Sequence, residues 1–120
     1  MSEIKDFTDL NAWKQSQEVV LGIYKATKLF PKDEQFGLTS QIRRAAISIT
    51  SNIAEGFGRR SRPDKSHFYI MAQASLYEVH SQFITAQQLG YVDNNSVLIN
   101  NISDAKRLLS GLIKSTQEKK

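Results

Sequence analysis

The side chains best suited to bind a metal ion are the two histidines, His67 and His80. Four-helix proteins with a di-iron centre use Glu-x-x-His pairs that project from facing helices. Here the residues three positions before the histidines are Asp64 and Tyr77, so neither pair is present. The chain also contains no cysteine, which removes thiolate ligands, disulfides and cysteine nucleophiles. We therefore expect no metal and no other cofactor.

A glycine-containing stretch at residues 55–60 (EGFGRR) superficially resembles a phosphate-binding loop. It lacks the third glycine of a dinucleotide-binding loop, the strand that precedes such a loop, and the Gly-Lys-Ser/Thr sequence of a P-loop. A helix end followed by basic residues explains the stretch without catalysis. No serine stands in a strand–turn–helix context, and neither histidine has an evident partner. We expect no enzymatic activity.

Length and composition predict a single helical domain over residues 1–120. Hydrophobic residues make up 40% of the chain and charged residues 23%, which is typical of a soluble protein with one modest core. Six glycines and two prolines are too few for the turns of a β-sandwich or barrel. No apolar run approaches the roughly 18–20 residues of a membrane span, and the N-terminus does not resemble a signal peptide. We expect a cytoplasmic protein that does not enter membranes.

Apolar periodicity predicts four helices, over residues 9–30, 38–56, 62–89 and 94–117. Thr8 or Asp9 is expected to cap the first, Ser61 the third, and Asp93 or Asn94 the fourth. The connections of about 4–8 residues place sequential helices antiparallel. The fold class we predict is therefore all-α, an up-down-up-down antiparallel four-helix bundle.

The net positive charge of the chain arises in one segment. The formal net charge is +4, and residues 38–67 carry all of it. The cations of this segment are Arg43, Arg44, Arg59, Arg60, Arg62 and Lys65, against the anions Glu55 and Asp64. Such a cluster at a helix start attracts phosphates, because backbone amides and the helix dipole favour anions there as well.

Five of these cations are candidates for contact with RNA or DNA: Arg43, Arg59, Arg60, Arg62 and Lys65. There is no basic recognition helix with polar base-reading positions, and aromatic residues are not interleaved with the cations. Binding would then depend on salt and select weakly among sequences. The alternative is that these charges are merely solvated.

The third predicted helix is unusual because Glu78 is its only formally charged side chain between Ser66 and Val92. Its predicted core face is Phe68, Ala72, Leu76, Val79, Phe83 and Ala86. The opposite face, roughly 140° around at about 100° per residue, is also largely apolar. A second apolar face indicates a contact surface. The candidate interface residues between copies of the chain are Ile47, Ile70, Ala74, Tyr77 and Ile84. Alternatively, the N- and C-terminal segments of the same chain cover this face.

A covered Glu78 would need a partner, because an unpaired buried carboxylate is costly. Counted from the loop near Arg60, Arg44 lies 16 residues back and Glu78 lies 18 residues forward, at nearly the same level of an antiparallel hairpin. We therefore predict an Arg44–Glu78 ion pair, within or between subunits. The expected hydrogen-bonding neighbours are Gln41, Ser48 and Ser75. The alternative is two solvated charges that never meet.

Residues 36–56 (FGLTSQIRRAAISITSNIAEG) resemble the signature of the 23S rRNA-intervening-sequence (four-helix bundle) protein family. The likeness extends over nearly the full chain through Phe7-x-x-Leu10-x-x-Trp13, Tyr24, Phe30-Pro31, Ala74-Ser75-Leu76-x-Glu78 and Leu89-Gly90-Tyr91. The resemblance implies a short four-helix bundle that assembles into a homopentamer, with no catalytic residues. Related folds include the accessory variability determinant protein of diversity-generating retroelements, which implies nucleic-acid binding by a basic pentameric barrel.

Together these features favour a non-enzymatic homo-oligomer, expected to be a pentamer, that binds RNA or DNA with little sequence specificity. The alternative is a structural or protein-partner module that binds no nucleic acid.

Overall fold

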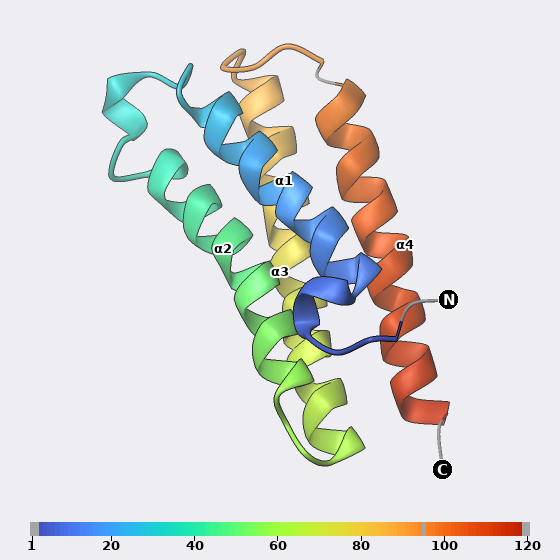
Figure 1. The fold of residues 1–120 in the computed structure, drawn as a ribbon. Helices are drawn as coiled ribbons and strands as arrows, with labels where there is room; N and C mark the ends of the chain where they lie inside the picture. Colours follow the sequence, from blue (N-terminus) through green and yellow to red (C-terminus); the bar gives the residue numbers. More distant parts are fainter. Residues whose placement is uncertain (1–2, 95, 119–120) are drawn as a thin grey trace.

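The computed structural model describes residues 3–94 and 96–118. This part of the chain is all-α, with four long helices and no strand (Figure 1). The long helices are α1 (Asn11–Thr27), α2 (Leu38–Phe57), α3 (Arg62–Gln88) and α4 (Ser96–Glu118). Two 3₁₀ turns, η1 (Phe7–Asp9) and η2 (Lys32–Glu34), precede α1 and α2. The predicted all-α class with four helices is confirmed.

Each helix packs against its neighbours in sequence, and α1 also packs against α4. The α2–α3 turn lies at one end of an elongated molecule, and the α1–α2 and α3–α4 connections lie at the other end (Figure 1). All four helices contribute large, fully buried side chains to one core, among them Ile23, Ile49, Phe83 and Leu109. The buried side chains recur at helical spacing, as the periodicity of the sequence predicts.

The first helix is shorter than the predicted residues 9–30, and the prediction of its cap was wrong. Asp6 and Asp9 instead form a capping box on η1: Asp6 Oδ1 accepts from the Phe7 amide at 2.9 Å, and Asp9 Oδ2 accepts from the Asp6 amide at 3.0 Å. The helix ends at Thr27, so that Phe30 lies in the following loop. There Phe30 is buried with its ring centroid 5.5 Å from that of Tyr91.

The ends of α3 agree closely with the prediction. The Ser61 hydroxyl accepts from the Asp64 amide at 3.2 Å, with proline in the first turn, as expected of the cap. Gly90 adopts a φ of 79°, a left-handed conformation that favours glycine and ends the helix. The helix α4 begins at Ser96, two residues after the predicted start at residue 94. Residue 95, directly before it, lies outside the described residues, so the predicted cap at Asp93 or Asn94 stays a prediction.

The core of α3 differs from the prediction at its first turns. Phe68 was predicted to be a core residue but is only half-buried, whereas Tyr69 is buried. Gly56 of α2 explains the change, because a Cβ at that position would lie 2.7 Å from Cε1 of Tyr69. The missing side chain of Gly56 thus makes room for the ring and lets α2 and α3 approach closely near their connecting turn.

Candidate nucleic-acid interface and self-association surface

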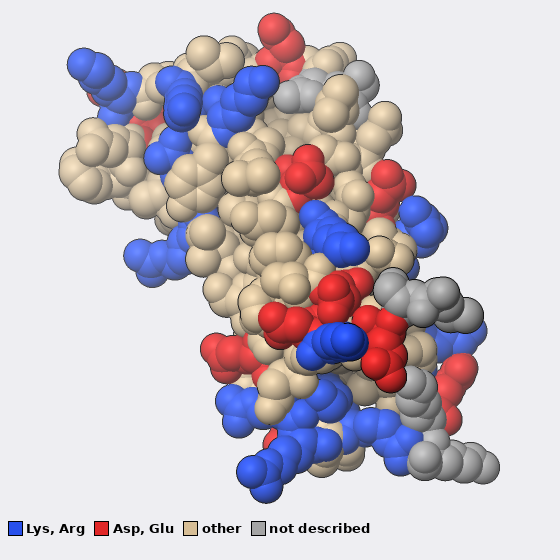
Figure 2. Space-filling view, in the orientation of Figure 1, with Lys and Arg blue, Asp and Glu red and all other residues tan. Residues whose placement is uncertain are grey.

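Four of the candidate cations lie around the turn between α2 and α3. We call this region the cationic end; it comprises Arg59, Arg60, Arg62 and Lys65. Figure 2 shows Lys and Arg side chains gathered at the lower end of the molecule, where Figure 1 places this turn. The structure therefore brings these four residues together, as the sequence predicts.

Two members of the cationic end already have partners in the chain. Lys65 Nζ donates to the Phe57 carbonyl oxygen at 2.6 Å and lies 5.2 Å from the centre of the Phe57 ring. A cation at this position offsets the negative end of the α2 dipole and satisfies a terminal carbonyl. Arg59 Nη2 lies 3.5 Å from Glu55 Oε2, and the Arg59 guanidinium lies 4.4 Å from the centre of the Phe68 ring. Lys65 therefore has a structural role. Arg59 is engaged by Glu55 and Phe68, so it is only partly available to a ligand.

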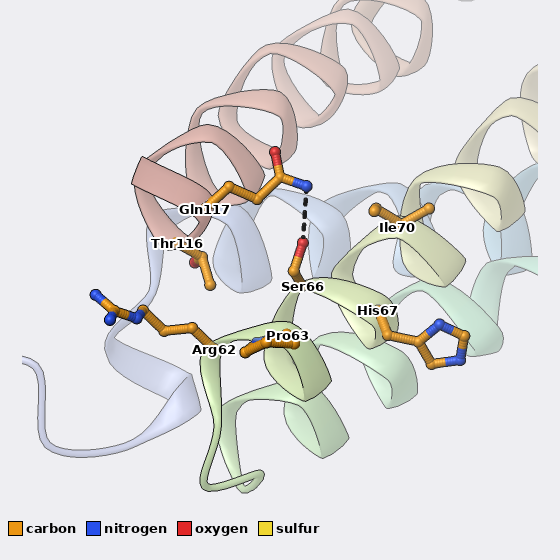
Figure 3. Close-up of a pocket in the computed structure, with 7 residues that line it drawn as sticks. All are labelled: Arg62, Pro63, Ser66, His67, Ile70, Thr116 and Gln117. Carbon is orange, nitrogen blue, oxygen red and sulfur yellow. Dashed lines mark hydrogen bonds between the residues drawn. The ribbon is translucent and has the colours of Figure 1, made fainter. Parts of the chain in front are cut away.

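Arg60 and Arg62 are the members of the cationic end whose guanidinium groups have no ion-pair partner within the described residues. Arg60 is exposed, and Arg62 is half-buried beside a hollow of about 590 Å³ between the start of α3 and the end of α4 (Figure 3). Both can reach a phosphate without breaking an internal ion pair.

The hollow beside Arg62 has no convergent catalytic groups. Its two helices are joined by a hydrogen bond from Gln117 Nε2 to Ser66 Oγ at 3.0 Å. Figure 3 shows the Arg62 and His67 side chains pointing away from each other. In the described part of the chain, no group of three or more His, Cys, Asp or Glu residues could hold a metal ion. The hollow is therefore a surface depression that offers separate polar contacts.

The structure places Arg43 away from the cationic end. Arg43 Nε donates to Thr27 Oγ1 at 2.7 Å, and its guanidinium lies 4.6 Å from the centre of the Tyr24 ring. From Arg43 to the end of α2 at Phe57, the 14 helical steps correspond to about 21 Å along the helix at about 1.5 Å per residue, and Arg59 follows beyond that end. Arg43 thus connects α2 to the end of α1. It is not part of the cationic end.

The outer face of α3 is bare in the single chain. We call Ile70, Ala74, Tyr77 and Ile84 the α3 outer face; all four are exposed, with exposed fractions of 45% for Ile70, 55% for Tyr77 and 40% for Ile84. Sequence reasoning missed Met71, which is 41% exposed beside them. The alternative that the chain's own terminal segments cover this face is therefore wrong for the described residues.

Ile47 is also exposed, but it lies apart from the α3 outer face. It follows Arg43 by one turn, on the edge of α2 that contacts α1. Ser48 lies on the other edge of α2, where Ser75 of α3 donates to its hydroxyl at 2.9 Å. An interface that includes Ile47 therefore uses a second patch on a different side of the subunit.

Arg44 and Glu78 line one hollow of about 510 Å³ between α2 and α3. The predicted neighbours Gln41, Ser48 and Ser75 line the same hollow. The two charges thus lie on either side of one depression, as the count from the turn predicts. The described residues of the single chain contain no Arg44–Glu78 ion pair, and Glu78 Oε2 accepts from Gln82 Nε2 at 3.2 Å instead. A pair formed between subunits stays a prediction.

A cluster between α3 and α4 was missed in the sequence. Lys106 Nζ lies 2.6 Å from His80 Nδ1 and 4.3 Å from the centre of the Tyr77 ring. Burial lowers the pKa of His80, and the positive charge of Lys106 lowers it further. The spacing of Tyr77 and His80 on one helix edge is a weak signal, because the partner Lys106 lies on another helix.

A second polar contact joins η2 to the connection after α3. The Tyr91 hydroxyl donates to Glu34 Oε2 at 2.8 Å, and the Leu38 amide donates to Glu34 Oε1 at 3.1 Å. Both hydrogen bonds lower the pKa of Glu34, and the bond from Tyr91 is the larger cause. The same contact raises the pKa of Tyr91.

The described residues therefore form a small all-α protein whose notable features are surfaces: a cationic end and an exposed apolar helix face. None of its described helices is both long and apolar enough to cross a membrane. The chain belongs to the 23S rRNA-intervening sequence protein family, whose family model matches residues 8–111.

The fold is similar to the crystal structure of a protein of unknown function from the S23 ribosomal protein family of Bacteroides thetaiotaomicron VPI-5482. The two are 23% identical, with a TM-score of 0.77, and the match covers 86% of this chain and 95% of the other. This likeness shows the shared fold alone. No curated protein matches the chain. The relation to the accessory variability determinant stays a prediction.

Proposed function

We propose that the protein is a non-enzymatic, up-down-up-down four-helix bundle that assembles into a homopentamer and binds RNA or DNA with little sequence specificity. The observation that carries the nucleic-acid proposal is the cationic end, where Arg60 and Arg62 are free of internal ion pairs within the described residues. The protein would act in the cytoplasm, where RNA occurs and where the absence of cysteine suits the reducing conditions.

The α3 outer face supports self-association. Its large apolar side chains are exposed in the single chain, and Glu78 is the only Asp, Glu, Lys or Arg of the sequence between Ser66 and Val92. The one charge that lies against this face from another helix in the described residues is the ammonium of Lys106, over the Tyr77 ring. Removing such a face from water is favourable through the hydrophobic effect. A second copy of the chain is the partner we propose, with Arg44 and Glu78 at the edge of the contact.

Assembly would strengthen a weak interaction with nucleic acid. A single subunit offers only two free cations at the cationic end, which is too little for tight binding. Several subunits repeat these cations around the assembly, so that a bound strand meets further sites at high effective concentration. Because the contacts are with phosphates, the affinity should fall steeply with salt and vary little with sequence.

The nucleic-acid proposal is tested by fluorescence anisotropy with labelled single- and double-stranded RNA and DNA over a salt series. The test variant is Arg60→Gln/Arg62→Gln, and the control is Lys28→Gln/Lys32→Gln, which removes the same charge from exposed lysines at the other end. For duplex DNA, the slope of log K against log salt should fall by about 1.8 per engaged subunit in the test variant, at about 0.9 per lost contact. The control should keep the wild-type slope. No binding at low salt would refute the proposal.

The assembly proposal is tested by sedimentation equilibrium, which should report five copies. Reversal of either charge, by Arg44→Glu or Glu78→Arg, should weaken assembly about tenfold or more, as for other close charge pairs between subunits. The double reversal should restore it. A monomer at micromolar concentration contradicts self-association, and absence of rescue contradicts the Arg44–Glu78 pair.

The second candidate function is a structural or protein-partner module that binds no nucleic acid. The contacts of Lys65 with Phe57 and of Arg59 with Glu55 favour it, because two cations of the cationic end then serve the fold. Under this alternative the protein still sediments as an oligomer, but anisotropy detects no binding at low salt.

A further inference from the structure

The contact between His80 and Lys106 depends on the protonation of the imidazole. The two nitrogens lie 2.6 Å apart, and the ammonium of Lys106 also lies 4.3 Å from the centre of the Tyr77 ring. A lysine ammonium only donates hydrogen bonds, so His80 Nδ1 must accept, which requires a neutral ring with its proton on Nε2. A protonated imidazole would direct an N–H of its own at the ammonium, and the two positive charges would repel each other.

Few other charges compete for this contact. Along α3 and α4, the other charged side chains within four residues of His80 or Lys106 are Glu78, Asp104 and Arg107, and on α2 Arg44 shares a hollow with Glu78. Arg107 pairs with Asp104 at 3.6 Å, and the Glu78 carboxylate accepts from Gln82. Among the described residues, Lys106 is the charged group that acts on the titration of His80.

Tyr77 connects this contact to the α3 outer face. Its ring is 55% exposed, and one of its faces receives the ammonium of Lys106 as a cation–π contact. The position of Lys106 therefore determines how much of this aromatic surface is available to a partner.

We propose that His80 and Lys106 form a proton-operated latch between α3 and α4. Neutral His80 holds Lys106 over the Tyr77 ring, and protonated His80 releases it, which uncovers the ring and adds a positive charge beside the α3 outer face. The latch stands on contacts within one chain. Its effect on assembly rests on the proposed self-association: in acid, the second charge disfavours burial of this face, and subunits separate.

The sign of the pH effect follows from the lowered pKa of His80. In the folded protein this pKa lies below the ordinary 6.5, so between the two values the unfolded chain binds more protons than the folded one. The latch therefore contributes fully to stability above about pH 6.5, and its contribution is lost as the pH falls through the folded pKa.

The latch is tested by an NMR titration of the imidazole and tyrosine ring signals in the full chain. The wild type should show His80 titrating below 6.5, with the Tyr77 signals following at the same midpoint. Lys106→Met keeps the aliphatic stem and should raise the pKa of His80 only in part, because burial is the larger cause. Lys114→Met, an exposed lysine of the same helix, should leave it unchanged. His80→Gln should abolish the pH response of Tyr77.

Two results would overturn the latch: Tyr77 signals that do not follow His80, or a pKa of His80 that Lys106→Met leaves in place. Circular dichroism of each variant checks that it is folded.

Sedimentation between pH 7.5 and 5 supplies the second readout, in which acid should dissociate the wild type but not His80→Gln. Acid dissociation shared by both proteins contradicts the link to assembly. A wild-type monomer at every pH instead refutes self-association, while the NMR titration still decides the latch.

Discussion

Replacing Gly56 with alanine tests the close approach of α2 and α3 that supports the cationic end. An added Cβ would lie 2.7 and 2.9 Å from two carbons of the Tyr69 ring and 3.0 Å from Cβ of Phe68. Tyr69 is buried, so its ring cannot turn outward to make room. The matched control is Gly111→Ala, because a Cβ at Gly111 in α4 meets nothing within 4 Å.

The expected size of the effect follows from two opposing contributions. Alanine is better than glycine inside a helix by about 1 kcal/mol, and this gain applies in full at Gly111. At Gly56 it is opposed by overpacking, which costs about 1–3 kcal/mol. We therefore expect Gly111→Ala to stabilise the protein by about 1 kcal/mol and Gly56→Ala to lie about 1–3 kcal/mol below it.

Urea denaturation followed by circular dichroism measures this difference, provided that the slope of the unfolding free energy against urea stays constant across the variants. If Gly56→Ala stabilised the protein as much as Gly111→Ala, the Tyr69 ring would not occupy the space beside Gly56. The account of how α2 and α3 meet at the cationic end would then be wrong.

Three further changes test separate parts of the structure. Ile84→Glu should give a folded monomer in sedimentation, because it places a charge on the α3 outer face, whereas Leu21→Glu, at a similarly exposed position on α1, should still assemble. Lys65→Met should lower the unfolding free energy by about 1 kcal/mol yet leave the salt slope of nucleic-acid binding unchanged; a reduced slope would return Lys65 to the interface. Tyr91→Phe should raise the pKa of Glu34 toward its ordinary 4.5 in a carboxyl NMR titration, since the tyrosine hydrogen bond is the largest cause of its lowering. The wild type loses that stabilisation as the pH falls through the folded pKa of Glu34, so the variant should lose less in acid; an unmoved pKa would contradict the contact.

Periodicity predicted the helices well, because the same apolar spacing that is visible in the sequence builds the core. Ile42, Ile49 and Ile53 of α2, spaced at the period of a helix, are all fully buried. The errors arose where a neighbour in space decides the outcome. Tyr69 replaces Phe68 in the core because a glycine on another helix makes room for it, and no pattern within α3 contains that information.

The candidate sites show the same limit. The cationic end could be predicted because Arg59, Arg60, Arg62 and Lys65 lie within one short turn and the helix that follows it. The separation of Arg43 from them already follows from the predicted helix over residues 38–56, but its contact with Thr27 of α1 depends on how the two helices pack. The His80–Lys106 contact joins residues 26 positions apart on two helices, so only the packing of α3 on α4 reveals it.

The connection between α2 and α3 has a consequence for how tightly a ligand can be held. Residues 58–61 are anchored on both sides, by Lys65 on the last turn of α2 and by the Ser61 cap on the first turn of α3. The backbone that carries Arg60 and Arg62 is thus already ordered before any strand arrives. A phosphate that docks there restricts little more than two side chains, and the entropy lost on binding is correspondingly small.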